Sequence, residues 1–395
     1  MALAPSDLHH HRQQFPSLQQ GHYFNFGGQG PMSQAALDAI CQAHHSFQIL
    51  GPFSGQVNDW INAETAAVRQ AIAAELQVAP DTLTLTDSVT TGCNIPLWGI
   101  GWQAGDHVLL SDCEHPGVIA TVQELAHRFG ITFSTCPLQS TLNSRDPVAD
   151  PVAVVAQHLQ PQTRLLVISH ILWNTGQVLP LRQIVVQCHD RNVQVLVDAA
   201  QSVGVLPLHL GELGADFYAF TGHKWLCGPA GLGSLYVHPA ASDTLRPTFI
   251  GWRGVTKDSA DAPTGFFPDG RRFEIATSDY TLYPGLREAI ALQNRWGSAE
   301  ERYRRICELS GYLWRGLKTI PRVRCLREAA PEAGLVSFVV EPRERSHGQV
   351  VAELEARKIM VRTILDPDCI RACVHYMTTE KEIDALVAAL GDVLG

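Results

Sequence analysis

One lysine lies in a sequence context that favours a buried, reactive amine over a solvated, charged one. Lys224 stands in the stretch FTGHKWLCGPAGLG, after an apolar run and before a turn rich in glycine and proline. A lysine enclosed in such surroundings loses the solvation of its ammonium charge, and its pKa falls. The neutral amine is the form that condenses with a carbonyl group to give an imine. Lys224 is therefore a candidate for holding a carbonyl compound as a Schiff base.

Other motifs supply partners for such a compound. Asp198 ends the apolar run in VLVDAAQSVG, where an unpaired carboxylate is costly to desolvate. A cationic ring nitrogen is its natural partner, and the pyridinium of pyridoxal phosphate (PLP) is such a group. Gln201 can then donate to the phenolic oxygen of PLP, while His115, in SDCEHPGV, can stack on the ring and relay protons. These residues predict a PLP site anchored on Lys224.

The phosphate of that cofactor needs an anion site. The stretch TDSVTTGCN (86–94) joins a strand-like run to a helical segment through small and hydroxyl residues. Free backbone N–H groups at a helix N-terminus bind anions. We therefore expect the phosphate near Val89 and Thr90, with Val89 able to offer only its backbone.

These motifs follow apolar runs that must position them. The runs are expected to be strands at 83–87, 107–112, 131–136, 164–170, 193–200, 216–222 and 232–237. They are rich in Val, Leu and Phe with little polar alternation, which is typical of strands covered on both faces. Helix-length segments such as 116–129 and 181–191 lie between them. This alternation predicts a mostly parallel α/β sheet with ligands at the carboxyl ends of its strands.

The remainder of the chain indicates a second, smaller unit. Residues 238–295 read as loop-rich and lead into a long charged helix near 297–318. Further strands are expected at 322–326, 335–341 and 370–375, with helices near 347–358 and 379–393. We expect an N-terminal segment (1–20) that packs with the small domain, a large cofactor-binding domain (21–290) and a small C-terminal α+β domain (291–395).

Composition narrows the class of protein. The chain has 395 residues and a net charge of -9, and it has no Lys/Arg-rich cluster, which argues against nucleic-acid binding. Its ten cysteines are scattered without a CxxC pair, so neither a metal site nor a disulfide framework is expected. No export signal and no apolar run of about 18 residues is apparent, so we expect a cytoplasmic protein without membrane spans. The three histidines at 9–11 fit a solvated helix start better than a metal tract.

The combination VDAAQSVG and FTGHKWLCGPAGLG resembles the class V aminotransferases of PLP fold type I. This family includes cysteine desulfurases, cystine C–S lyases and isopenicillin epimerase-like proteins, and the similarity runs over nearly the whole chain. The resemblance implies a large domain with a mostly parallel mixed sheet flanked by helices, and a homodimer with shared active sites. Trp173 departs from the family pattern, in which many members carry an asparagine beside the cofactor.

The resemblance also implies roles for particular residues. Lys224 is the imine lysine and α-proton base, Asp198 pairs with the pyridine nitrogen, and His115 is the stacking and catalytic residue. The other implied contacts to PLP come from Val89, Thr90, Gln201, Thr221, His223 and, across the dimer, Thr277. The substrate α-carboxylate goes to Arg371, and the other implied substrate contacts come from Arg362, Gly28 and Trp252.

The reaction depends on the step that comes after removal of the α-proton. Desulfurases of this family carry a nucleophilic cysteine on a mobile loop between two C-terminal arginine motifs. The corresponding stretch here, RTILDPDCIR (362–371), is short, and we expect Cys369 and Cys373 to be core residues. Elimination from L-cystine or L-cysteine to pyruvate, ammonia and persulfide or sulfide is therefore favoured.

Three alternatives stay open. One is a cysteine desulfurase that uses Cys369, for which an iron–sulfur acceptor protein is an implied partner in iron–sulfur cluster assembly. Another is an epimerase or transaminase acting on an amino acid without sulfur. The third is a non-catalytic protein of the same fold that traffics sulfur, although the joint presence of Lys224, Asp198, His115 and Arg371 speaks against it.

Overall fold

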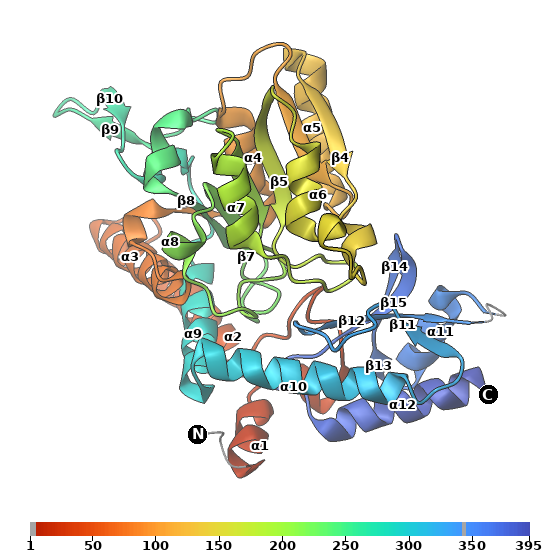
Figure 1. Ribbon diagram of the computed structural model, residues 1–395. Helices are drawn as coiled ribbons and strands as arrows, with labels where there is room; N and C mark the ends of the chain where they lie inside the picture. The colour runs from red at the N-terminus through yellow and green to blue at the C-terminus, as the bar shows by residue number, and fades with distance from the viewer. Residues whose placement is uncertain (1–4, 342–344) are drawn as a thin grey trace.

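The computed structural model describes residues 5–341 and 345–395, and its centre is a seven-stranded sheet (Figure 1). The strands are, in the order in which they lie side by side, β2 (Leu83–Thr86), β8 (Gly233–Val237), β7 (Phe217–Thr221), β6 (Gln194–Asp198), β5 (Thr163–Ser169), β3 (His107–Ser111) and β4 (Thr132–Cys136). Strands β7, β6, β5, β3 and β4 pair in parallel, and β8 runs antiparallel to both β2 and β7. The predicted mixed, mostly parallel sheet is confirmed.

Helices cover both faces of this sheet because successive strand residues point to opposite sides. In β5, Leu165 and Val167 join a core with helices α4 and α5, whereas Leu166 and Ile168 join a core with α3, α7 and α9. The helices of this domain are α2 (Gln34–Ile49), α3 (Gly55–Leu76), α4 (Val89–Gly99), α5 (Pro116–Phe129), α6 (Pro151–His158), α7 (Leu181–His189), α8 (Leu210–Leu213) and α9 (Leu282–Trp296). A hairpin of β9 (Val255–Lys257) and β10 (Pro263–Phe266) extends from its side (Figure 1).

Two expectations about these elements were wrong. Strand β4 is largely exposed, with Phe133 39% exposed, because it lies at the sheet edge and pairs only with β3. The stretch expected to be loop-rich contains α9, a helix of 15 residues. Pro284 and Gly285 in its first turn obscured the helical pattern. Both fit there, because proline is tolerated in a first turn and a Cβ on Gly285 would lie 2.5 Å from Ile40 of α2.

The C-terminal part forms a smaller α+β unit, as expected. Its antiparallel sheet has the order β11 (Val323–Cys325), β12 (Leu335–Val340), β15 (Asp368–Cys373) and β14 (Arg362–Leu365). Its helices are α10 (Ala299–Leu317), α11 (His347–Ala356) and α12 (Glu380–Leu394). Phe338, Leu313 and Leu386 lie in a separate apolar core between this sheet and these helices.

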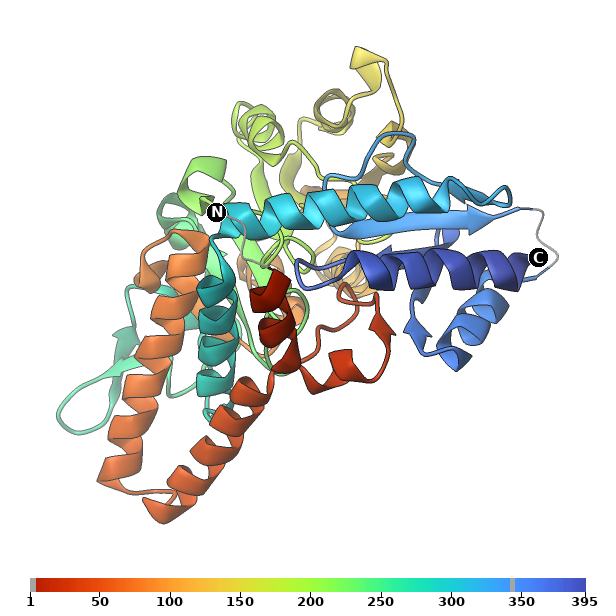
Figure 2. The same cartoon turned by 90° about the horizontal axis from the view of Figure 1, so that it is seen from below.

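The N-terminal segment lies where the two units meet (Figure 2). Helix α1 (Pro5–Gln13) contacts the chain beyond β15, where Arg12 pairs with Glu382 at 2.8 Å. Farther along, β1 (His22–Tyr23) pairs in parallel with β13 (Ile359–Met360). His11 is buried, so the expectation of a solvated histidine run was wrong for this residue.

Within the described residues, no helix is long and apolar enough to cross a membrane. The domain boundaries stay predictions.

Candidate active site

Lys224 lies just beyond the carboxyl end of β7 and is half-buried. The N-terminal segment packs directly against its main chain: the Gly30 N–H donates to the His223 carbonyl at 2.8 Å, and a Cβ on Gly30 would lie 2.1 Å from the Lys224 carbonyl oxygen. Burial lowers the pKa of Lys224 to about 8; Asp198 opposes this shift, while Arg371 and Arg362 add to it. The lysine can therefore supply a neutral amine near neutral pH.

Asp198 ends β6, the strand next to β7, and is 7% exposed. Its Oδ1 accepts the backbone N–H of Ala200 at 3.0 Å. His115 caps α5, where its Nδ1 accepts the Gly117 N–H at 3.2 Å. Burial lowers the pKa of His115, and the Asp198 charge opposes that shift. Lys224, Asp198 and His115 thus share one electrostatic environment at the carboxyl ends of β7, β6 and β3.

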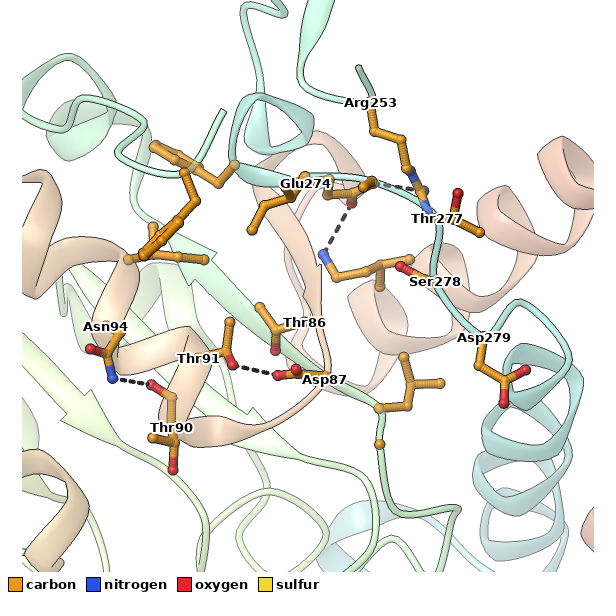
Figure 3. Close-up of a pocket in the computed structure, with 18 of the residues that line it drawn as sticks. Thr86, Asp87, Thr90, Thr91, Asn94, Arg253, Glu274, Thr277, Ser278 and Asp279 are labelled. Atoms are coloured by element: carbon orange, nitrogen blue, oxygen red, sulfur yellow. Dashed lines mark hydrogen bonds and ion pairs between the residues drawn. The ribbon is translucent and has the colours of Figure 1, made fainter. Parts of the chain in front are cut away.

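The predicted anion site lies at the N-terminus of α4. Ser88 is the N-cap and accepts the Thr91 N–H at 3.1 Å, and the first N–H groups of the helix, on Val89 and Thr90, need partners outside the helix. Thr90 borders a cavity of about 1130 Å³, with Thr277 on the opposite side (Figure 3). The N-terminus of α4 can thus offer the N–H groups of Val89 and Thr90 to an anion, and Thr277 lies across the cavity from Thr90 in the single chain.

Arg371 approaches from the small domain and is 1% exposed. Its Nη1 donates to the Trp173 carbonyl, whereas its Nε and Nη2 have no hydrogen-bond partner among the described residues. Burying unpaired guanidinium donors is costly, so these two atoms favour an anionic ligand. Arg362 lies beside it, on the neighbouring strand β14, and is exposed.

Gln201 has a fixed side-chain amide. Its Nε2 donates to the Gly27 carbonyl at 2.9 Å, and its Oε1 accepts the indole N–H of Trp225 at 2.8 Å. A Cβ on Gly27 would lie 3.1 Å from Nη2 of Arg371, so this glycine leaves room beside the arginine. Gly28, next in the chain, is half-buried and donates its N–H to the Asn25 carbonyl at 2.9 Å.

The remaining predicted residues fall into two groups. Thr221 and His223 flank the lysine turn and share a hydrogen bond of 2.7 Å between Oγ1 and Nδ1. Burial lowers the pKa of His223, with a further contribution from Lys224. Trp252 instead borders a second cavity, beside α3 and the β9–β10 hairpin, and is 56% exposed.

Sequence reasoning missed two residues that adjoin predicted ones. Trp225 comes directly after Lys224 and is fully buried. Glu114 precedes His115, and its Oε2 accepts the Ser169 hydroxyl at 2.9 Å. Burial raises the pKa of Glu114 to about 8. In each case the sequence showed a polar group next to a residue that already had an assigned role. These groups are the indole N–H of Trp225 beside Lys224 and the carboxyl group of Glu114 beside His115.

The donors and acceptors at this site fit PLP. Asp198 offers a carboxylate for a ring nitrogen, α4 offers N–H groups for a phosphate, and Lys224 offers an amine of lowered pKa. The unpaired Nε and Nη2 of Arg371 fit the carboxylate of an amino acid. Within the described residues, no group of three or more His, Cys, Asp or Glu side chains is placed to hold a metal ion.

Comparison with known proteins gives consistent matches. The sequence model of the class-V aminotransferases matches residues 53–386. Two structures of C-DES are 51% and 52% identical to this chain, with TM-scores of 0.94 and 0.93, and each match covers 96% of this chain and 99% of C-DES. One is a lysine mutant with glycine covalently linked to the PLP cofactor; the other is described as the cystine C–S lyase in complex with its reaction product, cysteine persulfide.

A more distant relative is isopenicillin N epimerase from Streptomyces clavuligerus, which is 29% identical over 94% of both chains. Because the family model spans most of the sequence and C-DES shares about half of its residues and its fold, this chain belongs to the class-V aminotransferase family and has PLP fold type I.

Proposed function

We propose that this protein is a PLP-dependent C–S lyase that converts L-cystine and water to pyruvate, ammonia and cysteine persulfide. The observation that carries the proposal is the similarity to C-DES, a cystine C–S lyase, at 52% identity over 96% of the chain. The active-site geometry supports it, because the aldehyde, ring nitrogen and phosphate of PLP and the carboxylate of an amino-acid substrate each have a matching group.

PLP, when bound, supplies an electron sink that stabilises the negative charge left by loss of an α-proton. Lys224 would anchor it, Asp198 would hold the ring nitrogen, and Val89 and Thr90 would offer N–H groups to the phosphate. The substrate carboxylate pairs with the free Nε and Nη2 of Arg371, which orients the amino acid.

Once the substrate amine has taken its place, the freed amine of Lys224 would remove the α-proton; burial lowers the pKa of this amine to about 8, which suits a base near neutral pH. The Cβ–S bond of cystine breaks, and the sulfur leaves with the bonding electrons as cysteine persulfide. Hydrolysis of the remaining three-carbon enamine gives pyruvate and ammonia.

The position of Cys369 favours elimination over desulfuration. Its side chain is fully buried between β12 and β14, and burial raises the pKa of its thiol to about 12. A sulfur nucleophile must be an accessible thiolate. Asn174 also holds the turn between β14 and β15, through a hydrogen bond of 3.1 Å to the Asp366 carbonyl. Cys369 is thus poorly suited to attack a substrate sulfur.

Product analysis tests the proposal. Purified protein is incubated with L-cystine or L-cysteine, and pyruvate, alanine and protein-bound persulfide are measured. We expect pyruvate and free cysteine persulfide from cystine, and Cys369→Ala should keep most of the activity. Alanine with enzyme-bound persulfide and no pyruvate would instead establish a desulfurase. A protein whose near-visible absorption does not change with any amino acid would be a non-catalytic binder.

We also propose a homodimer with shared active sites. The tip between α2 and α3 exposes Ile49 (84%) and Phe53 (97%), and the segment before β9 exposes Phe249 and Trp252. These exposed apolar side chains are candidates for burial against a second copy of the chain, since a contiguous apolar patch marks an interaction surface. In a dimer, Thr277 and Trp252 can serve the site of the partner.

Mixing two inactive variants tests this arrangement. Lys224→Ala and Thr277→Ala subunits should regain activity on mixing, because one site of each mixed dimer has both residues intact. A monomer in analytical ultracentrifugation would contradict the proposal.

The ten cysteines, all free, agree with a cytoplasmic location. An acceptor protein for the persulfide sulfur is a partner to be sought.

A further inference from the structure

Trp225 connects the lysine turn to four other segments of the chain. It is fully buried, with its indole ring against Phe26 at a centroid distance of 6.3 Å and against His375 at 6.0 Å. A Cβ on Gly204 or Gly334 would lie within 2.8 Å of Trp225 atoms, so both glycines leave the space that it fills. Trp225 is thus closely packed on several sides.

The indole N–H determines the orientation of the Gln201 amide. Indole nitrogen is a donor only, so the Gln201 atom at 2.8 Å from it must be the carbonyl oxygen. The amide nitrogen then faces the Gly27 carbonyl at 2.9 Å. One hydrogen of the Gln201 NH₂ group is used in that bond, which leaves the second for a ligand in the site.

The main chain of Trp225 is fixed as well. Its carbonyl oxygen lies 2.9 Å from Nε2 of Gln293 on α9 and 3.1 Å from Nε2 of His375, beyond β15. Because a carbonyl only accepts, His375 must carry its proton on Nε2. Burial lowers the pKa of His375 to about 3, which keeps the ring neutral and this arrangement unchanged across the working pH range. Helix α9 and the segment after β15 thus both hold the residue next to Lys224.

We propose that Trp225 is a positioning residue for the lyase reaction: its indole N–H fixes the orientation of the Gln201 amide, so that the second N–H of its NH₂ group is available to the cofactor, and its clamped backbone holds Lys224 in place relative to that amide. This inference rests on the proposed function, in which Gln201 donates to the phenolic oxygen of PLP. A donor at that oxygen stabilises its anionic form.

Trp225→Phe in the PLP-loaded enzyme tests the inference, because it keeps an aromatic ring and removes the N–H. The pH midpoint of the near-visible absorption change should rise by about one unit, since the anionic oxygen loses its oriented donor. The kcat should fall about tenfold while KM changes less than about threefold. Trp314→Phe is the matched control, because that indole donates to the Arg327 carbonyl at 3.0 Å in the small domain.

A double-mutant cycle with Gln201→Met separates this role from a structural one. If Trp225 acts through Gln201, Trp225→Phe should add no further midpoint shift in the Gln201→Met background. Additive shifts, or an unchanged midpoint in Trp225→Phe, would overturn the inference. Benzothienylalanine at position 225 keeps the shape of the indole without its N–H and provides the same test if the phenylalanine variant does not fold. A wild-type protein that binds no PLP would refute the proposed function itself.

Discussion

At the scale of single residues, the candidate site combines an arginine with two donors that have no partner among the described residues and a lysine of lowered pKa. Arg371 keeps Nε and Nη2 free while Nη1 is tied to the Trp173 carbonyl, so the guanidinium presents one edge of its fork. Lys224 is held at lowered pKa by burial and by two nearby arginines. The free donors of Arg371 favour a carboxylate, and the neutral amine of Lys224 favours imine formation.

Arg371→Lys should therefore weaken substrate binding while keeping the charge. Lysine cannot form two parallel hydrogen bonds to a carboxylate, and the loss of about 1.5–3 kcal/mol corresponds to a roughly 10–100-fold rise in KM. Steady-state kinetics with L-cystine measures it. Arg362→Lys, at an exposed neighbour, serves for comparison, and an unchanged KM in Arg371→Lys would show that the carboxylate binds elsewhere.

The lowered pKa of Lys224 makes cofactor loading depend on pH. Because the neutral amine is reactive, the rate at which the apoprotein binds PLP as an imine should rise with pH and level off above about 8. Arg362→Gln removes a positive charge that lowers this pKa and should move the midpoint upward. Stopped-flow absorbance follows the reaction; a rate independent of pH in this range would contradict the expected pKa.

At the scale of elements, the carboxyl ends of β7, β6 and β3 bring Lys224, Asp198 and His115 together. The position of α4 determines where an anion can bind. Helix α4 lies against β7 at Gly92, where a Cβ would be 2.9 Å from the Cβ of Ala219. The helix can approach the sheet this closely only because that residue has no side chain.

Gly92→Val should push α4 away from β7. Overpacking of this kind costs about 1–3 kcal/mol, and the displaced helix N-terminus should also bind PLP more weakly. Urea unfolding and PLP titration measure the two effects. Gly101→Ala is the matched control, since a Cβ there meets no atom within 4 Å. Equal effects of the two substitutions would argue against close packing as the cause.

Most elements could be predicted from the sequence because burial on both faces gives the central strands continuous apolar runs. Helix α5 occurs at the predicted residues, and β6 and β7 end at the motifs that carry Asp198 and Lys224. Strand β4 and helix α9 were misjudged for opposite reasons. An apolar run does not show that its strand lies at the edge of a sheet. Pro284 and Gly285 are poor helix formers, so the sequence did not indicate a helix that tertiary packing stabilises.

At the scale of the whole molecule, buried neutral histidines join the domains. His11 of α1 lies 3.1 Å from the Tyr376 hydroxyl, and His375 contacts the lysine turn. Burial lowers the pKa of His11 and of His170 to about 4, and that of His375 to about 3. Protonating any of them therefore opposes the folded state.

Acid should thus destabilise the protein. These histidines have lowered pKa values in the folded state, so their contribution is complete above about 6.5 and is lost as pH falls from there toward about 4. His11 alone can account for up to about 3 kcal/mol. His11→Gln should flatten the dependence of the urea midpoint on pH, whereas His45→Gln, at an exposed position, should not. Identical pH profiles for both variants would contradict this role of His11.

The sequence by itself determined the chemistry of the cofactor site and the strands that carry it. Lys224, Asp198 and His115 each carry a polar group directly after an apolar, strand-like run. The neighbouring residues in the sequence therefore sufficed to predict that these groups are buried at strand ends. Only the tertiary structure decided how Gln201 is oriented, which Arg371 atoms are free, and where Thr277 and Trp252 lie. The orientation of Gln201 depends on Gly27 and Trp225, and the free atoms of Arg371 depend on its bond to Trp173. These partners lie in separate segments of the chain, and no local sequence pattern encodes a contact between separate segments.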